Sequence, residues 1–115
     1  MTRVPFQFDQ ADGMVTVYGT AWLDGDALVL EVCRKALQMV PLGGETYRIP
    51  VEDVEDIDVE AGLLKRALVV RLIEWESVAG FLTEPADRLK LPVAKKHVAA
   101  AEALARAVRL SNLPR

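Results

Sequence analysis

The chain has few of the side chains that catalytic and metal sites use. Its 115 residues include one cysteine, Cys33, one histidine, His97, and only two serines. A single cysteine excludes an intrachain disulfide and favours a reducing compartment. No stretch reaches the roughly 18 consecutive apolar residues of a membrane span, and the first residues lack the apolar segment of a signal peptide. The sequence therefore predicts a cytoplasmic protein.

Neither basic nor acidic residues are in large excess over the other. The 14 Lys and Arg residues face 17 Asp and Glu residues, for a net charge of −3 at pH 7. This balance excludes a binder that relies on bulk positive charge, so no nucleic-acid partner is expected. With 51% hydrophobic and 27% charged residues, the composition is that of one globular domain. A chain of this length buries a core without metal or disulfide.

No pattern of a catalytic or cofactor site is present. The sequence has neither a glycine-rich phosphate loop nor a paired metal-ligand spacing. We interpret His97, beside Lys95 and Lys96, as a protonatable surface residue, and Cys33 as a small packing residue of a strand. Accordingly, we predict that the protein is not an enzyme and that it has no catalytic residue and no cofactor.

The acidic stretch over residues 52–60 resembles a calcium loop only superficially. Asp56, Asp58 and Glu60 have the spacing that begins an EF-hand loop. The sixth position of that loop would be Ala61 instead of glycine, and the twelfth would be Ala67 instead of glutamate. The stretch is therefore predicted to be a strand with a solvated acidic face, and no metal site is expected.

Alternating apolar and polar residues predict a mainly β chain. The clearest hairpin joins residues 14–23 to residues 28–33 through Asp24-Gly25-Asp26, with Gly19 as a bend or bulge. Pro41-Leu42-Gly43-Gly44 is interpreted as a loop. Further strands are predicted at 46–49, 57–61, 67–75, 77–83 and 88–93, with a helical turn at 51–54 and an edge position for the strand that contains Pro92.

The chain then changes character over residues 94–110, which are rich in alanine and predict one helix. Val98, Ala101, Ala105 and Val108 form a narrow apolar stripe, which Leu104 widens. Small side chains allow close approach, so the helix is expected to lie tightly against a sheet or a barrel end. The predicted core comprises Val17, Leu23, Leu28, Leu30, Val32, Ile57, Val59, Leu68, Val70, Leu72, Leu89, Leu91, Val98, Ala101, Ala105 and Val108.

About seven antiparallel strands followed by one helix resemble the bacterial pleckstrin-homology-like (PH-like) domains and the related GRAM domains. The resemblance rests on residues 19–30, on residues 48–59 with the Ile49-Pro50 step, and on Gly62-Leu63-Leu64 before the next strand. It covers roughly residues 13–111 and implies a seven-stranded antiparallel PH-like barrel with one C-terminal capping α-helix. Residues 1–12 are then expected to be an N-terminal extension, and residues 112–115 a C-terminal tail.

The lipid-binding members of that family place Lys and Arg around the loop of their first hairpin. In this chain we assign residues 23–26 to that loop, and they are acidic. The nearest basic pair is Arg34-Lys35. Because an anionic head group would meet like charge there, membrane lipid is not expected as a partner, and soluble inositol phosphates should bind no better than inorganic phosphate.

Apolar residues outside the predicted core faces indicate an interface. The favoured partner is a second copy of the chain or another protein, although residues 36–42 could instead fold back over a barrel end. Two rival functions are a weak membrane-surface adaptor, in which Leu63-Leu64 inserts and Lys65-Arg66 meets anionic lipid, and a small-ligand carrier. The candidate interface residues are Trp22, Leu37, Met39, Val40, Leu42, Leu63, Leu64 and Trp75.

Overall fold

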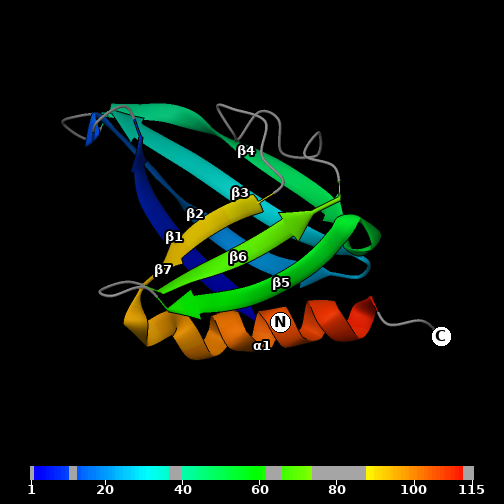
Figure 1. The fold of residues 1–115 in the computed structure, drawn as a ribbon. Helices are drawn as coiled ribbons and strands as arrows, with labels where there is room; N and C mark the ends of the chain where they lie inside the picture. Colours follow the sequence, from blue (N-terminus) through cyan, green and yellow to red (C-terminus); the bar gives the residue numbers. More distant parts are fainter. Residues whose placement is uncertain (1, 11–12, 37–39, 62–65, 74–87, 113–115) are drawn as a thin grey trace.

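The computed structural model of the chain describes residues 2–10, 13–36, 40–61, 66–73 and 88–112 (Figure 1). In these residues, seven strands form two antiparallel sheets, and one helix follows them. The first sheet has the order β1 (Arg3–Gln10), β2 (Val15–Asp24), β3 (Ala27–Ala36), β4 (Val40–Pro50). The second has the order β5 (Val54–Ala61), β6 (Arg66–Leu72), β7 (Arg88–Val93). Short 3-10 turns, η3 (Val51–Asp53) and η5 (Lys95–His97), precede β5 and the helix α1 (Val98–Ser111).

The second sheet lies across one face of the longer first sheet, and α1 runs along the side of both (Figure 1). The helix packs mainly against β5 and also contacts β1, β2 and β6, while β1 lies against β7. The buried face of α1 consists of Ala101, Leu104, Ala105 and Val108. The predicted helix is therefore confirmed, and so is its apolar stripe from Ala101 to Val108, whereas Val98 lies outside the buried face.

The mainly β architecture is confirmed, but a closed barrel is not found. The strand pairings of the described residues form two separate sheets, of four and three strands. The predicted hairpin is β2–β3, with Gly25 in its turn at φ 61°. The helical turn at 51–53 and the edge position of β7 are also confirmed. The strand predicted over 77–83 lies outside the described residues.

The strand β1 corrects the prediction that strands begin near residue 14. Val4 and Phe6 are buried, and they alternate with the exposed residues Arg3, Pro5 and Gln7. All eight residues of β1 pair with β2. Pro5 is tolerated because β1 is the terminal strand of its sheet and has a ladder on one side only.

The strand β4 corrects the prediction of a loop at residues 41–44. These residues lie inside a strand of 11 residues. Gly43 is paired with Arg34 and Pro41 with Lys35, so Leu42 is the extra residue of a β-bulge. Gly43 has a φ of 101°, which glycine adopts without a side-chain penalty. The turn-like residues thus mark a bulge within the strand.

Gly19 serves close strand packing, and the predicted bulge at this position is wrong. The register continues unshifted through Gly19, which faces Phe6 on β1 and Val32 on β3. A Cβ atom added there would overlap the main-chain carbonyl oxygen of Glu31 and lie 2.9 Å from Cζ of Phe6. Only glycine fits at this point without a shift of the backbone.

The core fills the space between the two sheets and the helix. Most of the predicted core residues are buried, and Leu23, Val59 and Val98 are half-buried. The core also contains residues that the predicted core omits, from β1, β4, η3, β5, β7 and α1. These additions include Val4, Phe6, Ile49, Val51, Val54, Val93 and Leu104.

Candidate interaction surfaces

In the two sheets of the described residues, four strands lie at edges, and three of these edges are covered. β1 and β7 lie against each other, and α1 covers β5. Among the described elements, β4 packs extensively against β3 alone. The outer edge of β4 is therefore the open edge in the described part of the fold.

The open edge is exposed over much of its length. Residues 41–46 are all exposed, and Leu42, at the bulge, is 54% exposed. A strand edge presents main-chain N–H and C=O groups that lack a partner strand, and such an edge can pair with another chain. An apolar side chain at its end adds surface that association would remove from water.

The structure places only some of the predicted interface residues. Leu42 lies at the bulge of β4, and Val40 begins the same strand. Trp22 lies on β2, two strands away from β4. Leu37, Met39, Leu63, Leu64 and Trp75 lie outside the described residues.

Trp22 belongs to a row of side chains that crosses the outer face of the first sheet. The register places Arg3, Trp22, Val29 and Arg48 side by side on the four strands. The guanidinium carbon of Arg3 lies 4.2 Å from the centroid of the Trp22 ring, a cation–π contact. Because Arg3 covers the ring and the side chain is half-buried, Trp22 is a weaker anchor for a partner than Leu42.

A polar cluster on the other face of the first sheet joins β3 to β4. The Tyr47 hydroxyl donates a hydrogen bond to Glu45, and Nη1 of Arg34 lies 3.8 Å from Oε1 of Glu45. Burial raises the pKa of Tyr47 above its ordinary value of 10.0, and the hydrogen bond to the Glu45 carboxylate acts in the same direction. Glu45 therefore joins a side chain of the edge strand β4 to one of its neighbour β3.

The first hairpin of the chain is β1–β2, so the assignment of residues 23–26 to its loop is wrong. Asp24 ends β2, and Asp26 lies in the turn between β2 and β3. The basic pair Arg34-Lys35 has contacts of its own, because Arg34 pairs with Glu45 and Nζ of Lys35 lies 4.8 Å from the Tyr18 ring centroid. The expectation against inositol phosphates now rests on these contacts instead of the acidic turn.

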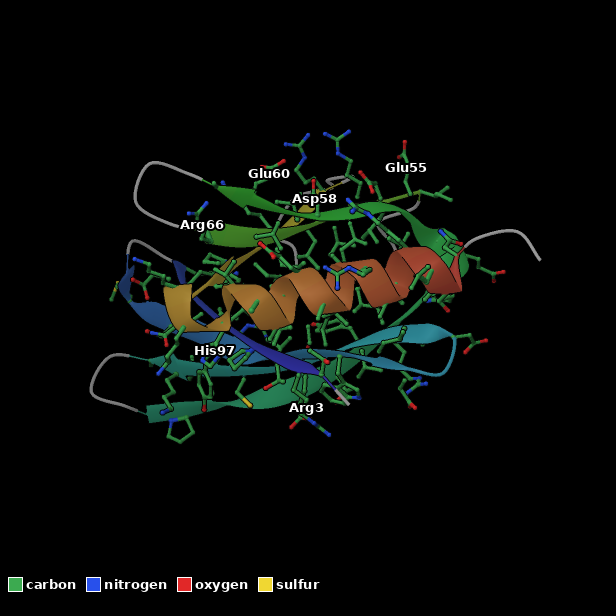
Figure 2. All side chains as sticks on the ribbon, turned by 90° about the horizontal axis from the view of Figure 1, so that it is seen from below. Arg3, Glu55, Asp58, Glu60, Arg66 and His97 are labelled. Carbon is green, nitrogen blue, oxygen red and sulfur yellow. The ribbon has the colours of Figure 1, made fainter. Side chains whose placement is uncertain are left out.

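Charge is segregated within the second sheet and the turns beside it. Figure 2 shows Glu55, Asp58 and Glu60 along β5, above α1. The acidic residues all belong to η3 and β5, and the basic residues to β6, β7 and η5. The acidic set is Glu52, Asp53, Glu55, Asp56, Asp58 and Glu60, and the basic set is Arg66, Arg71, Arg88, Lys90, Lys95 and Lys96.

Arg109 of α1 ties the helix to the acidic strand. Its Nε atom lies 3.5 Å from Oδ1 of Asp56, and its Nη2 atom lies 3.5 Å from Oδ1 of Asp58. A shallow groove of about 260 Å³ lies beside this contact, lined by Asp58, Val59, Glu102, Ala105, Arg106 and Arg109. The solvated acidic face predicted for β5 is confirmed. Because ion pairs of the fold occupy one wall of the groove, we assign it no ligand.

The remaining candidate residues form no catalytic set in the described residues. His97 is the N-cap residue of α1 and is half-buried, with no side-chain capping bond. Cys33 is half-buried in β3. No group of three or more His, Cys, Asp or Glu side chains in the described part of the chain has the arrangement of a metal site. No helix within the described ranges is long and apolar enough to cross a membrane.

Comparison with known proteins returns no relative. No protein-family model, no curated protein and no solved structure matches this chain. The function is therefore argued from the fold and its surfaces.

Proposed function

We propose that this chain is a non-enzymatic, PH-like protein-interaction module that associates with a second copy of itself. In this proposal the two sheets belong to a PH-like barrel that α1 caps, and the module acts in the cytoplasm. The order of a four-stranded sheet, a three-stranded sheet and a final helix supports the fold assignment. The absence of catalytic motifs in the sequence supports a role in binding.

The open edge of β4 carries the proposal. The other three sheet edges are covered within the fold, by β1 against β7 and by α1 against β5. A second copy offers the same open edge, so one two-fold contact would cover both edges at once. A strand edge buries less area than the roughly 1,200–2,000 Å² of a standard stable interface. We therefore expect dimers that form and dissociate with concentration.

Light scattering over a concentration series tests the proposal directly. The unmodified protein should change from monomer to dimer as its concentration rises through the micromolar range. Leu42→Asp should shift this change to higher concentration, because pairing would place a charge against the partner's edge. Leu110→Asp is the matched control, since Leu110 is 63% exposed on α1, away from β4. A monomer at high micromolar concentration would rule out the proposed self-association.

A further inference from the structure

We infer that two copies pair their β4 strands in antiparallel fashion about a two-fold axis that passes beside Thr46. The inference rests on the proposed self-association and specifies its geometry. It follows from the limits of the regular part of β4 and from the side chains that each possible axis would place opposite one another.

The regular part of β4 has a defined start and end. At one end the bulge at Leu42 and the positive φ of Gly43 interrupt the ladder, because a bulge bends the strand and displaces its hydrogen-bonding groups. At the other end Pro50 has no N–H to donate. Residues 44–49 therefore remain for regular pairing with another strand.

Two-fold symmetry limits the possible registers. In an antiparallel pair about such an axis, the numbers of facing residues add up to twice the number of the residue at the axis. An axis at Glu45 or at Arg48 would place like charges directly opposite each other, which destabilises a strand pair. An axis at Tyr47 would place Glu45 opposite the partner subunit's Ile49, and Ile49 is fully buried in the core.

An axis at Thr46 avoids these conflicts. Thr46 then faces its own copy, and threonine pairs are favourable across strands. Glu45 faces the partner subunit's Tyr47. Within one chain, Tyr47 already donates a hydrogen bond to Glu45, so the two residue types are compatible neighbours. The five facing pairs span residues 44–48, all inside the regular segment. Leu42 then comes close to the partner subunit's Pro50 at the end of the ladder, which covers the exposed side chain.

Cysteine cross-linking tests this register in a Cys33→Ser background. Thr46→Cys should form a disulfide-linked dimer under mild oxidation, because the residue at the axis meets its own copy. Glu45→Cys and Tyr47→Cys should each cross-link poorly alone and well when the two variants are mixed. Because hydrogen-bonded and non-hydrogen-bonded positions alternate along the strands, either the Thr46–Thr46 pair or the Glu45–Tyr47 pair occupies a non-hydrogen-bonded position. Facing side chains approach most closely there, which suits a disulfide.

Non-reducing electrophoresis separates the outcomes, with Leu110→Cys as the control for random collision. Cross-linking of Thr46→Cys or of the mixed pair, at least tenfold faster than the control, supports the inference. Self-cross-linking at Tyr47→Cys without cross-linking at Thr46→Cys overturns it in favour of another axis. A dimer in light scattering without any β4 cross-link overturns the register and leaves the proposed self-association intact. A monomer in light scattering overturns both.

Discussion

A side chain at Gly19 should be one of the most damaging small substitutions in this protein. In Gly19→Ala the new Cβ would overlap the carbonyl oxygen of Glu31. That oxygen belongs to β3, which is held between β2 and β4 on its two sides. The carbonyl therefore has little freedom to move, and β2 and β3 must separate locally.

The cost can be estimated from the contacts. Separating the strands would weaken about two ladder hydrogen bonds at about 1 kcal/mol each, and overpacking adds about 1–3 kcal/mol. The lower backbone entropy of alanine in the unfolded chain returns about 0.4–1 kcal/mol. We expect Gly19→Ala to lower the free energy of unfolding by about 3 kcal/mol.

Urea denaturation with linear extrapolation measures this loss. Gly44→Ala is the matched control in the same sheet, because its Cβ would lie 3.1 Å from the Val32 carbonyl oxygen and 3.4 Å from Sγ of Cys33. It should cost less than about 1 kcal/mol, since the edge strand can adjust. If Gly19→Ala stays within about 0.5 kcal/mol of the unmodified protein, the close-approach argument is refuted. Rescue by Phe6→Leu would identify the ring, and not the carbonyl, as the obstacle.

Three further measurements test the core, the helix contact and the open edge. Leu72 is 1% exposed, and its neighbour Ile73 is 63% exposed. Leu72→Ala should therefore lower the free energy of unfolding by about 2–5 kcal/mol, whereas Ile73→Ala should change it by less than about 0.5 kcal/mol. Arg109→Ala should cost about 1 kcal/mol in dilute buffer and less in about 1 M salt, because its two carboxylate contacts are solvent-exposed and screened. Since the folded state raises the pKa of Tyr47 above 10.0, it holds the phenol proton more tightly than the unfolded chain does. This difference stabilises the folded state fully below pH 10.0, and the stabilisation is lost as the pH rises past that value. Tyr47→Phe should therefore reduce the fall in the urea midpoint of unfolding between about pH 9 and about pH 11.

The sequence predicts an element best where hydrophobic period and turn chemistry agree. Residues 14–33 combine both signals, and they form the hairpin β2–β3. In β4 the two signals conflict, because Pro41 and the Gly43-Gly44 pair are typical of a loop. Only the register against β3 reveals that these residues accommodate a bulge. Turn residues inside a long strand cannot be distinguished from a true turn without the partner strand.

The strand β1 determines which hairpin comes first in the chain, so it bears on the candidate site as well as on the fold. Val4, Phe6 and Phe8 alternate at strand period, so the signal for a strand is present in the sequence. Without β1 in the prediction, the acidic turn beside Asp24 falls in the first hairpin of the chain, whereas the structure places it in the second. The open edge of β4 could not be predicted from the residues either, because it depends on which of the other edges the fold covers. That information exists only in the arrangement of the two sheets and α1.

In the described part of the chain α1 follows all seven strands, so it is the last of these elements to be synthesised. The strands β1 to β4 pair with their neighbours in sequence, so the first sheet can assemble hairpin by hairpin as the chain leaves the ribosome. Its apolar face stays uncovered until β5 to β7 have been made, and α1 completes the core last. A nascent chain that stalls before residue 98 would therefore expose the part of the core that α1 covers in the complete fold, the kind of apolar surface that chaperones bind. Synthesis of the final helix is the step that ends this exposure.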